Sequence, residues 1–139
     1  MSVNGNMDNM DSSENQSLDG LVDREKYIYH KNIKILVHDY SNLTGESAVH
    51  TVTAHADAVI RRGERNLVML VDVTDAFADR EVLAAFKRNW ARNTGFFNKT
   101  AVVGAQGVVR FFLDLVNRFA NTNALAFDEE QEALDWLVE

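Results

Sequence analysis

The sequence predicts an α/β fold, in which a mixed, mostly parallel five-stranded sheet begins with an antiparallel hairpin and carries about four helices. Two observations lead to this prediction. Short runs of β-branched and aromatic residues alternate with longer amphipathic stretches, at the spacing of strand–helix–strand crossovers. The run 67–71 is apolar throughout, which is typical of a central strand covered on both faces.

The chain divides into an acidic tail and one domain. Residues 1–22 contain four acidic residues, no basic residue and no apolar period, so we expect a disordered tail. Residues 23–139 form a single domain, since a chain of 139 residues with 46% apolar and 25% charged residues is typical of one globular unit.

The hairpin is predicted at the start of this domain. The β-rich runs 27–30 and 33–39 are separated only by Lys31 and Asn32. Asparagine tolerates the left-handed backbone that a two-residue hairpin turn requires. We therefore expect these two residues to form the turn.

A helix is predicted over 45–62. Apolar residues recur in it at helical spacing, from Ala48 to Ile60. Thr44 is placed to cap its first turn, and Gly63 is placed to end it.

Three further strand–helix steps follow in the second half of the chain. A helix over about 80–94 is expected to be capped by Asp79 and ended by Gly95. A strand over 100–103 leads into a helix over about 106–120, with Gly104 and Gly107 at the tight junction. The last strand, 124–127, precedes a helix that Asp128 is expected to cap.

Several of these segments resemble the SpoIIAA-like branch of the STAS superfamily. The resemblance covers about residues 25–138. It rests on four segments in the right order, namely 33–41 (IKILVHDYS), 70–74 (LVDVT), 99–104 (KTAVVG) and 127–137 (FDEEQEALDWL). It implies a small α/β sandwich with one antiparallel edge strand, which agrees with the element order derived above.

The resemblance also implies functions that involve binding. Better-known relatives bind partner proteins under control of phosphorylation, and others resemble Sec14-type lipid carriers. The anti-sigma-factor antagonists carry a phosphorylatable serine where the second helix begins. This chain has residues 77–81 (FADRE) there, without a hydroxyl, and Thr74 is the nearest one. The phosphorylation switch of those relatives therefore does not carry over.

Catalytic and metal chemistry find little support in the residues. The chain has no cysteine, and neither Ser41 nor Ser47 stands in a nucleophile elbow. The histidines His50 and His55 are five residues apart, which points them to different sides of a helix. We therefore expect no catalytic residue, cofactor or metal ion, and we interpret the histidines as solvated or hydrogen-bonded.

A degenerate phosphoacceptor domain of the receiver type is a further alternative. Asp39 and Asp72 end strands, and Lys99 begins one in this prediction. However, the acid pair of receiver domains is missing, and Lys99 stands at the wrong end of its strand. Capping of the following loops by the two aspartates is the simpler interpretation.

Two surfaces are candidate binding sites. Basic residues gather on one side of the helix predicted over 80–94, either as a solvated face or as a site for an anionic ligand or partner. These residues are Arg80, Lys87, Arg88 and Arg92. The helix over 106–120 has an unusually wide apolar arc, which neighbouring helices, a second subunit or an apolar ligand would cover. The arc includes Phe111, Phe112, Leu115 and Phe119.

The sequence thus predicts a non-enzymatic binding or regulatory protein of the SpoIIAA-like type. A homodimer and a regulatory protein partner are expected, and a carrier of a small apolar or anionic ligand is the alternative. The net charge of −7 argues against nucleic-acid binding, and no apolar run is long enough to span a membrane. With no signal peptide visible, the expected location is the cytoplasm.

Overall fold

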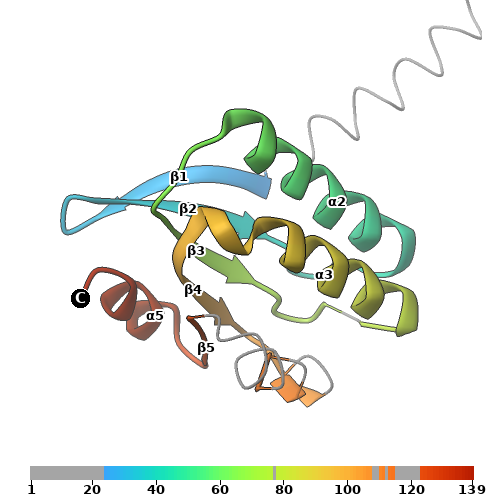
Figure 1. Cartoon of the computed structure of the whole chain (residues 1–139). Helices are drawn as coiled ribbons and strands as arrows, with labels where there is room; N and C mark the ends of the chain where they lie inside the picture. The colour runs from blue at the N-terminus through green and yellow to red at the C-terminus, as the bar shows by residue number, and fades with distance from the viewer. Residues whose placement is uncertain (1–23, 77, 108–109, 112, 115–122) are drawn as a thin grey trace, which may run out of the picture.

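Five strands form one sheet in the order β1-β2-β3-β4-β5 (Figure 1). Their bounds are β1 Glu25–His30, β2 Ile33–Asp39, β3 Leu67–Asp72, β4 Phe97–Val103 and β5 Ala124–Phe127. β1 runs antiparallel to β2, and every later pair is parallel. The predicted mixed sheet with an N-terminal antiparallel hairpin is confirmed.

The computed structural model describes residues 24–76, 78–107, 110–111, 113–114 and 123–139. The predicted acidic tail (1–22) lies outside the described residues. So does most of the helix predicted over 106–120, including Phe112, Leu115 and Phe119.

Helices cover both faces of the sheet. The described residues contain the α-helices α2 Gly45–Arg62, α3 Arg80–Asn93 and α5 Glu130–Leu137. α2 and α3 lie side by side over one face, and α5 covers the other (Figure 1). The described part of the chain therefore has three of the about four helices expected.

The hairpin turn follows the prediction. Lys31 and Asn32 have φ angles of 49° and 67°, the left-handed values that a type I′ turn needs at both central residues. The turn sets the register in which Ile28 pairs with Ile35 and His30 with Ile33.

Two predicted helix ends are confirmed. Asp79 Oδ1 accepts a hydrogen bond of 2.9 Å from the backbone N–H of Val82, which caps α3. Gly63 ends α2 in the left-handed conformation, with its N–H 3.1 Å from the Val59 oxygen.

Of two further predicted caps, Thr44 is confirmed in position only and Asp128 was wrong. Thr44 stands at the N-cap of α2 but makes no capping hydrogen bond from its side chain. Gly45 follows it with a φ of 54°, so the first turn is not regular there. With Asp128 as its N-cap, α5 would begin at Glu129. It begins at Glu130 instead, and Glu129 is the N-cap, in extended conformation.

The region between α3 and β4 also differs from the prediction. α3 ends at Asn93 and continues as a 3₁₀ turn over Thr94–Phe96, so Gly95 does not end the α-helix. β4 begins at Phe97 because Phe97 already pairs with Leu67, with an irregularity in the register after that pair. Lys99 therefore lies inside the strand and does not begin it.

Strand alternation divides the core into two layers. Met69, Val71 and Val102 face α2 and α3, and Phe86 and Trp90 pack on that layer. On the other face, the layer under α5 consists of Ile35, Val37, Leu70, Ala101, Val103, Ala133 and Leu137.

Gly104 allows two loops to approach each other at the carboxyl ends of the strands. Its φ is 82°, and a Cβ on it would lie 2.8 Å from the Thr74 Cα. This contact is far too short for real atoms and involves backbone, so no side-chain movement relieves it. The tight geometry expected after β4 is thus confirmed, and it rests on this close approach.

We expect Gly104→Ala to lower the free energy of unfolding by about 2–3 kcal/mol, because it adds a backbone clash to the cost of a left-handed alanine. Gly63→Ala is the matched control. Its φ is 67°, but nothing lies within 4 Å of its added Cβ, so only the conformational cost of about 1 kcal/mol applies. Urea denaturation of both variants measures the difference. Equal losses of unfolding free energy in the two variants would contradict the prediction, because they would show that the Thr74 backbone shifts to make room for the added methyl group.

Candidate functional site

A pocket of about 340 Å³ opens between the sheet and the layer of α2 and α3. Apolar side chains from both layers form much of its wall, and they come from α2, β3, α3 and β4. They are Val52, Ala56, Met69, Val71, Phe86, Trp90 and Phe97. The pocket therefore lies beneath α3, and it opens toward the exposed residues Thr94, Asn98 and Asn123, which also line it.

Polar groups interrupt this apolar wall. β2 and the residue after it contribute His38 and Tyr40, β4 contributes Thr100, and α3 contributes Asn89 and Asn93. His38 and Tyr40 are two residues apart, so strand alternation turns both toward the α2 side. A wall that is mainly apolar with a few placed polar groups is typical of small-molecule sites.

Two polar atoms of α3 are buried and unpartnered. The Trp90 indole nitrogen and the Asn93 side-chain oxygen have no hydrogen-bond partner among the described residues. Asn93 is only 9% exposed. Such an atom costs about 1–3 kcal/mol of desolvation when nothing replaces its water.

Asn89 shows that α3 is able to satisfy a buried amide. Its Nδ2 donates to the Ala85 oxygen at 2.9 Å and to Thr53 Oγ1 at 3.2 Å, and its Oδ1 accepts from Arg92 at 2.8 Å. Asn93 lies one turn further along the same helix. The Asn93 side-chain oxygen has no partner, whereas the equivalent oxygen of Asn89 accepts a hydrogen bond from Arg92.

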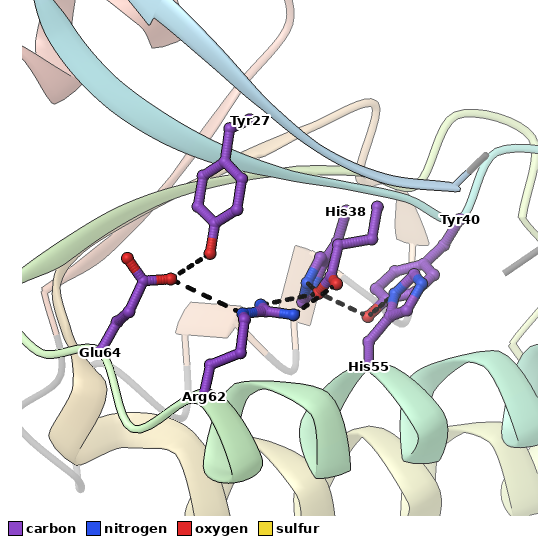
Figure 2. Close-up of polar contacts among 7 residues, drawn as sticks. Tyr27, His38, Tyr40, His55, Arg62 and Glu64 are labelled. Atoms are coloured by element: carbon purple, nitrogen blue, oxygen red, sulfur yellow. Dashed lines mark hydrogen bonds and ion pairs between the residues drawn. The ribbon is translucent and has the colours of Figure 1, made fainter. Parts of the chain in front are cut away.

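A chain of hydrogen bonds leads from the surface to the pocket wall (Figure 2). Glu25 Oε2 lies 2.7 Å from His38 Nε2, and the Tyr40 hydroxyl lies 3.2 Å from His38 Nδ1. The same hydroxyl is 3.1 Å from His55 Nδ1 on α2. His38 and His55 are only 2% and 3% exposed, so two imidazoles lie within the core.

The partners fix the direction of each bond in this chain. Burial raises the pKa of Glu25, but the hydrogen bonds from His38 and Arg62 outweigh burial and lower it to about 2. The carboxylate only accepts, so His38 donates through Nε2. Burial lowers the pKa of His38, which leaves Nδ1 free to accept from Tyr40. Burial likewise raises the pKa of Tyr40, so the hydroxyl keeps its proton and accepts from His55.

Arg62 anchors the outer end of this chain at the last turn of α2. Its guanidinium holds Glu25 through two hydrogen bonds of 2.7 and 3.1 Å, and its Nε lies 3.6 Å from Glu64. Glu64 also accepts from the Tyr27 hydroxyl (Figure 2) and, at 3.0 Å, from Lys34 Nζ. Burial and the bond to Glu64 raise the pKa of Tyr27 to about 12.

Comparison with known proteins agrees with this architecture. Residues 35–138 match the family model described as SpoIIAA-like. The chain belongs to the SpoIIAA-like family. The resemblance drawn from the sequence is thus confirmed, although no curated protein matches the chain significantly.

Two solved structures share the SpoIIAA-like architecture at low sequence identity. One is an uncharacterized protein of the DUF3478 family from Shewanella loihica PV-4, with a TM-score of 0.63 and 17% identity over 81% of this chain and 91% of that one. The other is an anti-sigma-factor antagonist (STAS) domain protein from Planctomyces limnophilus. It has a TM-score of 0.55 and 12% identity over 83% of this chain and 98% of that one. These likenesses show the fold alone.

The basic residues predicted as a site in this SpoIIAA-like chain are all exposed on α3, and none of them lines the pocket. They are Arg80, Lys87, Arg88 and Arg92. Arg92 is engaged by Asp57 of α2 and by Asn89. Binding of an anion or an acidic partner on this face stays a prediction.

The acidic strand ends behave as loop caps. Asp39 Oδ1 accepts from the Ser41 N–H, and Asp72 Oδ1 accepts from the Thr74 N–H, both at 2.9 Å. The two aspartates pair across β2 and β3, but Lys99 pairs with Val68, well away from the carboxyl end of the sheet. Two residues of the receiver-like alternative, Asp39 and Asp72, therefore lie side by side, but Lys99 does not join them.

The sequence interpretation of the histidines as hydrogen-bonded is confirmed for His38 and His55, but it missed that they meet. A signal was present, since His38 and Tyr40 share a strand face. His55 also falls between Val52 and Val59 on the buried stripe of α2.

The described residues contain neither a metal-binding cluster nor a membrane-spanning helix. Among them, no group of three or more histidine, cysteine or acidic residues is placed to hold a metal ion. No helix in the described part of the chain is long and apolar enough to cross a membrane.

We expect the stability of this domain to fall as the pH is lowered, in two stages. His38 has a lowered folded pKa, so its contribution is complete above its ordinary value of 6.5 and declines below it. Glu25 contributes fully above its ordinary value of 4.5, and this contribution is lost as the pH falls toward about 2.

Glu25→Gln isolates the second stage. We expect it to cost about 2 kcal/mol at pH 7, because charged hydrogen bonds are lost, and to flatten the decline between pH 5 and 2. Glu46→Gln, at an exposed position on α2, is the control. It should change neither the free energy of unfolding at pH 7 nor its decline between pH 5 and 2. Urea unfolding across this pH range measures them, and an unaltered slope in Glu25→Gln would contradict the assignment.

Proposed function

We propose that this protein binds a small, mainly apolar molecule in the pocket between the sheet and helices α2 and α3. The pocket itself carries the proposal. Its volume of about 340 Å³ is at the lower end of the range for small-molecule sites, roughly 300–1,000 Å³. Protein interiors are otherwise close-packed, with few voids larger than a water molecule.

The residues of α2 support this proposal because they leave the space open. Val52 and Ala56 lie one turn apart on the face toward the sheet, and both line the pocket. Ala56 is almost completely buried, so it occupies a core position with the smallest apolar side chain available. A leucine there would fill space that a ligand needs.

The regulatory alternative has less support within the described residues. The STAS relatives that act through phosphorylation do so at the start of the second helix. In this chain that position holds Asp79, whose carboxylate is already bonded to the Val82 N–H. A homodimer or regulatory partner stays a prediction. On the expected face, Phe111 is 66% exposed, whereas Leu113 is buried.

Native mass spectrometry of protein purified from its own source tests the proposal. We expect a small molecule that stays with the folded chain and leaves on denaturation. In Ala56→Leu, we expect the occupancy to fall strongly while the fold is retained, since the added side chain fills the pocket. Ala84→Leu, at an exposed position on α3, should keep the wild-type occupancy.

Two results would contradict the proposal. One is a wild-type protein that carries no added mass under conditions that preserve noncovalent complexes. The other is an Ala56→Leu variant with undiminished occupancy, which would place the bound molecule outside the pocket.

A further inference from the structure

We propose that the molecule bound in this pocket is an amphiphile, which inserts its apolar body beneath α3 and keeps its one polar end at the mouth of the pocket. This inference rests on the proposed binding function and specifies the class and the orientation of the ligand. The mouth is formed by the exposed lining residues Thr94, Asn98 and Asn123.

The lining of the pocket is apolar where it is buried and polar where it is exposed. The buried apolar part includes Val52, Ala56, Met69 and Val71. The three mouth residues carry hydroxyl and carboxamide groups instead. Burial stabilises an apolar group but removes the hydration of a polar one, so a molecule with both kinds of group is held best with its apolar part inward.

The mouth residues meet at the amino ends of β4 and β5. Thr94 begins the 3₁₀ turn that leads into β4, Asn98 is the second residue of β4, and Asn123 immediately precedes β5. Asn123 Nδ2 donates to the Asn98 backbone oxygen at 3.3 Å, which joins the two segments. Exposed hydroxyl and carboxamide groups both donate and accept, so a polar head group finds partners there while it stays in contact with water.

The opposite end of the pocket is less suited to a polar head group. His38 and Tyr40 line it near the carboxyl end of β2. His38 is bonded to Glu25 and Tyr40, and the Tyr40 hydroxyl is bonded to His38 and His55. A head group placed here would lose its water and would gain a partner from these two side chains only by breaking one of their bonds. These bonds therefore disfavour the reverse orientation.

The placement of charge leads to the same orientation. Lys99 is the one side chain with a permanent charge among the described lining residues. Its ammonium lies on the α5 side of the sheet, where it donates to the Trp136 oxygen at 2.8 Å. A charged group of the ligand would be unpaired in the buried part of the pocket, which is costly. At the mouth it keeps its hydration, so a head group of either charge is compatible with this orientation.

Charges introduced at the mouth test the orientation on the full chain. Asn98→Lys and Asn98→Asp place opposite charges at the same exposed position. Isothermal titration calorimetry at pH 7 in about 0.1 M salt measures the association constants of 1-octanol, octanoate and octylammonium. We expect the ratio of the octanoate constant to the octylammonium constant to be about tenfold higher in Asn98→Lys than in Asn98→Asp, because the charged end of each probe lies beside the new charge.

The uncharged probe and a second pair of variants serve as controls. The affinity of 1-octanol should differ little between Asn98→Lys and Asn98→Asp, since it reports the pocket and not the charge. Ala84→Lys and Ala84→Asp change the net charge by the same amounts, but Ala84 is exposed on α3 and is not a lining residue. The ratio of octanoate to octylammonium binding should therefore be nearly equal in the two Ala84 variants.

A second mouth position repeats the test outside the sheet. Asn98 lies within β4, whereas Thr94 precedes the strand. We expect Thr94→Lys and Thr94→Asp to change the ratio in the same direction as the two Asn98 variants.

The outcomes separate the two proposals. An equal ratio in the lysine and aspartate variants at both mouth positions, with 1-octanol still bound, would overturn the orientation while the pocket remains a binding site. A change of the same size in the Ala84 pair would also overturn it, because the effect would not come from the mouth. Failure of all three probes to bind the wild type would overturn the proposed function as well.

Discussion

The carboxylate of Glu25 is the constraint on which the α2 side of the domain depends. It receives two hydrogen bonds from Arg62, at the end of α2, and one from His38, on β2. It thereby joins the two strands of the edge hairpin to the helix above them. Without this negative charge, the guanidinium would lose its two hydrogen bonds to Glu25, and the His38 N–H would remain buried and unsatisfied.

The consequences of this contact extend to the pocket. Since Glu25 fixes the His38 ring, His38 accepts from Tyr40, and Tyr40 in turn accepts from His55. The wall of the pocket next to β2 is therefore made of side chains that are already fully engaged. On this side the pocket therefore has a fixed polar wall.

Two buried polar atoms on α3, Trp90 Nε1 and Asn93 Oδ1, have no hydrogen-bond partner among the described residues. Such atoms lower the stability of a core, because their hydration is lost and nothing replaces it. The α3 side of this core is therefore less completely satisfied than the β2 side, where each polar group of the hydrogen-bond chain has a partner.

Local chemistry explains what was predictable from the sequence. The Lys31–Asn32 turn, the bounds of α2 and the Asp79 cap each depend on residues within a few positions of one another. The pocket and the hydrogen-bond chain do not. Glu25 meets Arg62 across 37 residues, and a single sequence contains no signal for such a pairing.

The same reasoning explains the errors. Asp128 has the right chemistry for a cap, but pairing of β5 with β4 and packing of α5 set where the helix begins. Lys99 was expected at a strand start, whereas pairing with β3 extends the strand back to Phe97. In both cases tertiary contacts outweighed the local signal.

Occupancy of the pocket is tested most directly by the indole signals in a ¹⁵N–¹H correlation spectrum. The chain has two tryptophans, one in the pocket wall and one under α5, so the spectrum contains its own control. As 1-octanol, a small and mainly apolar probe, is added, we expect the Trp90 indole signal to shift because Trp90 lines the pocket, and the Trp136 signal to stay in place. A Trp90 signal that does not move at saturating alcohol, whether or not the Trp136 signal moves, would contradict binding in the pocket.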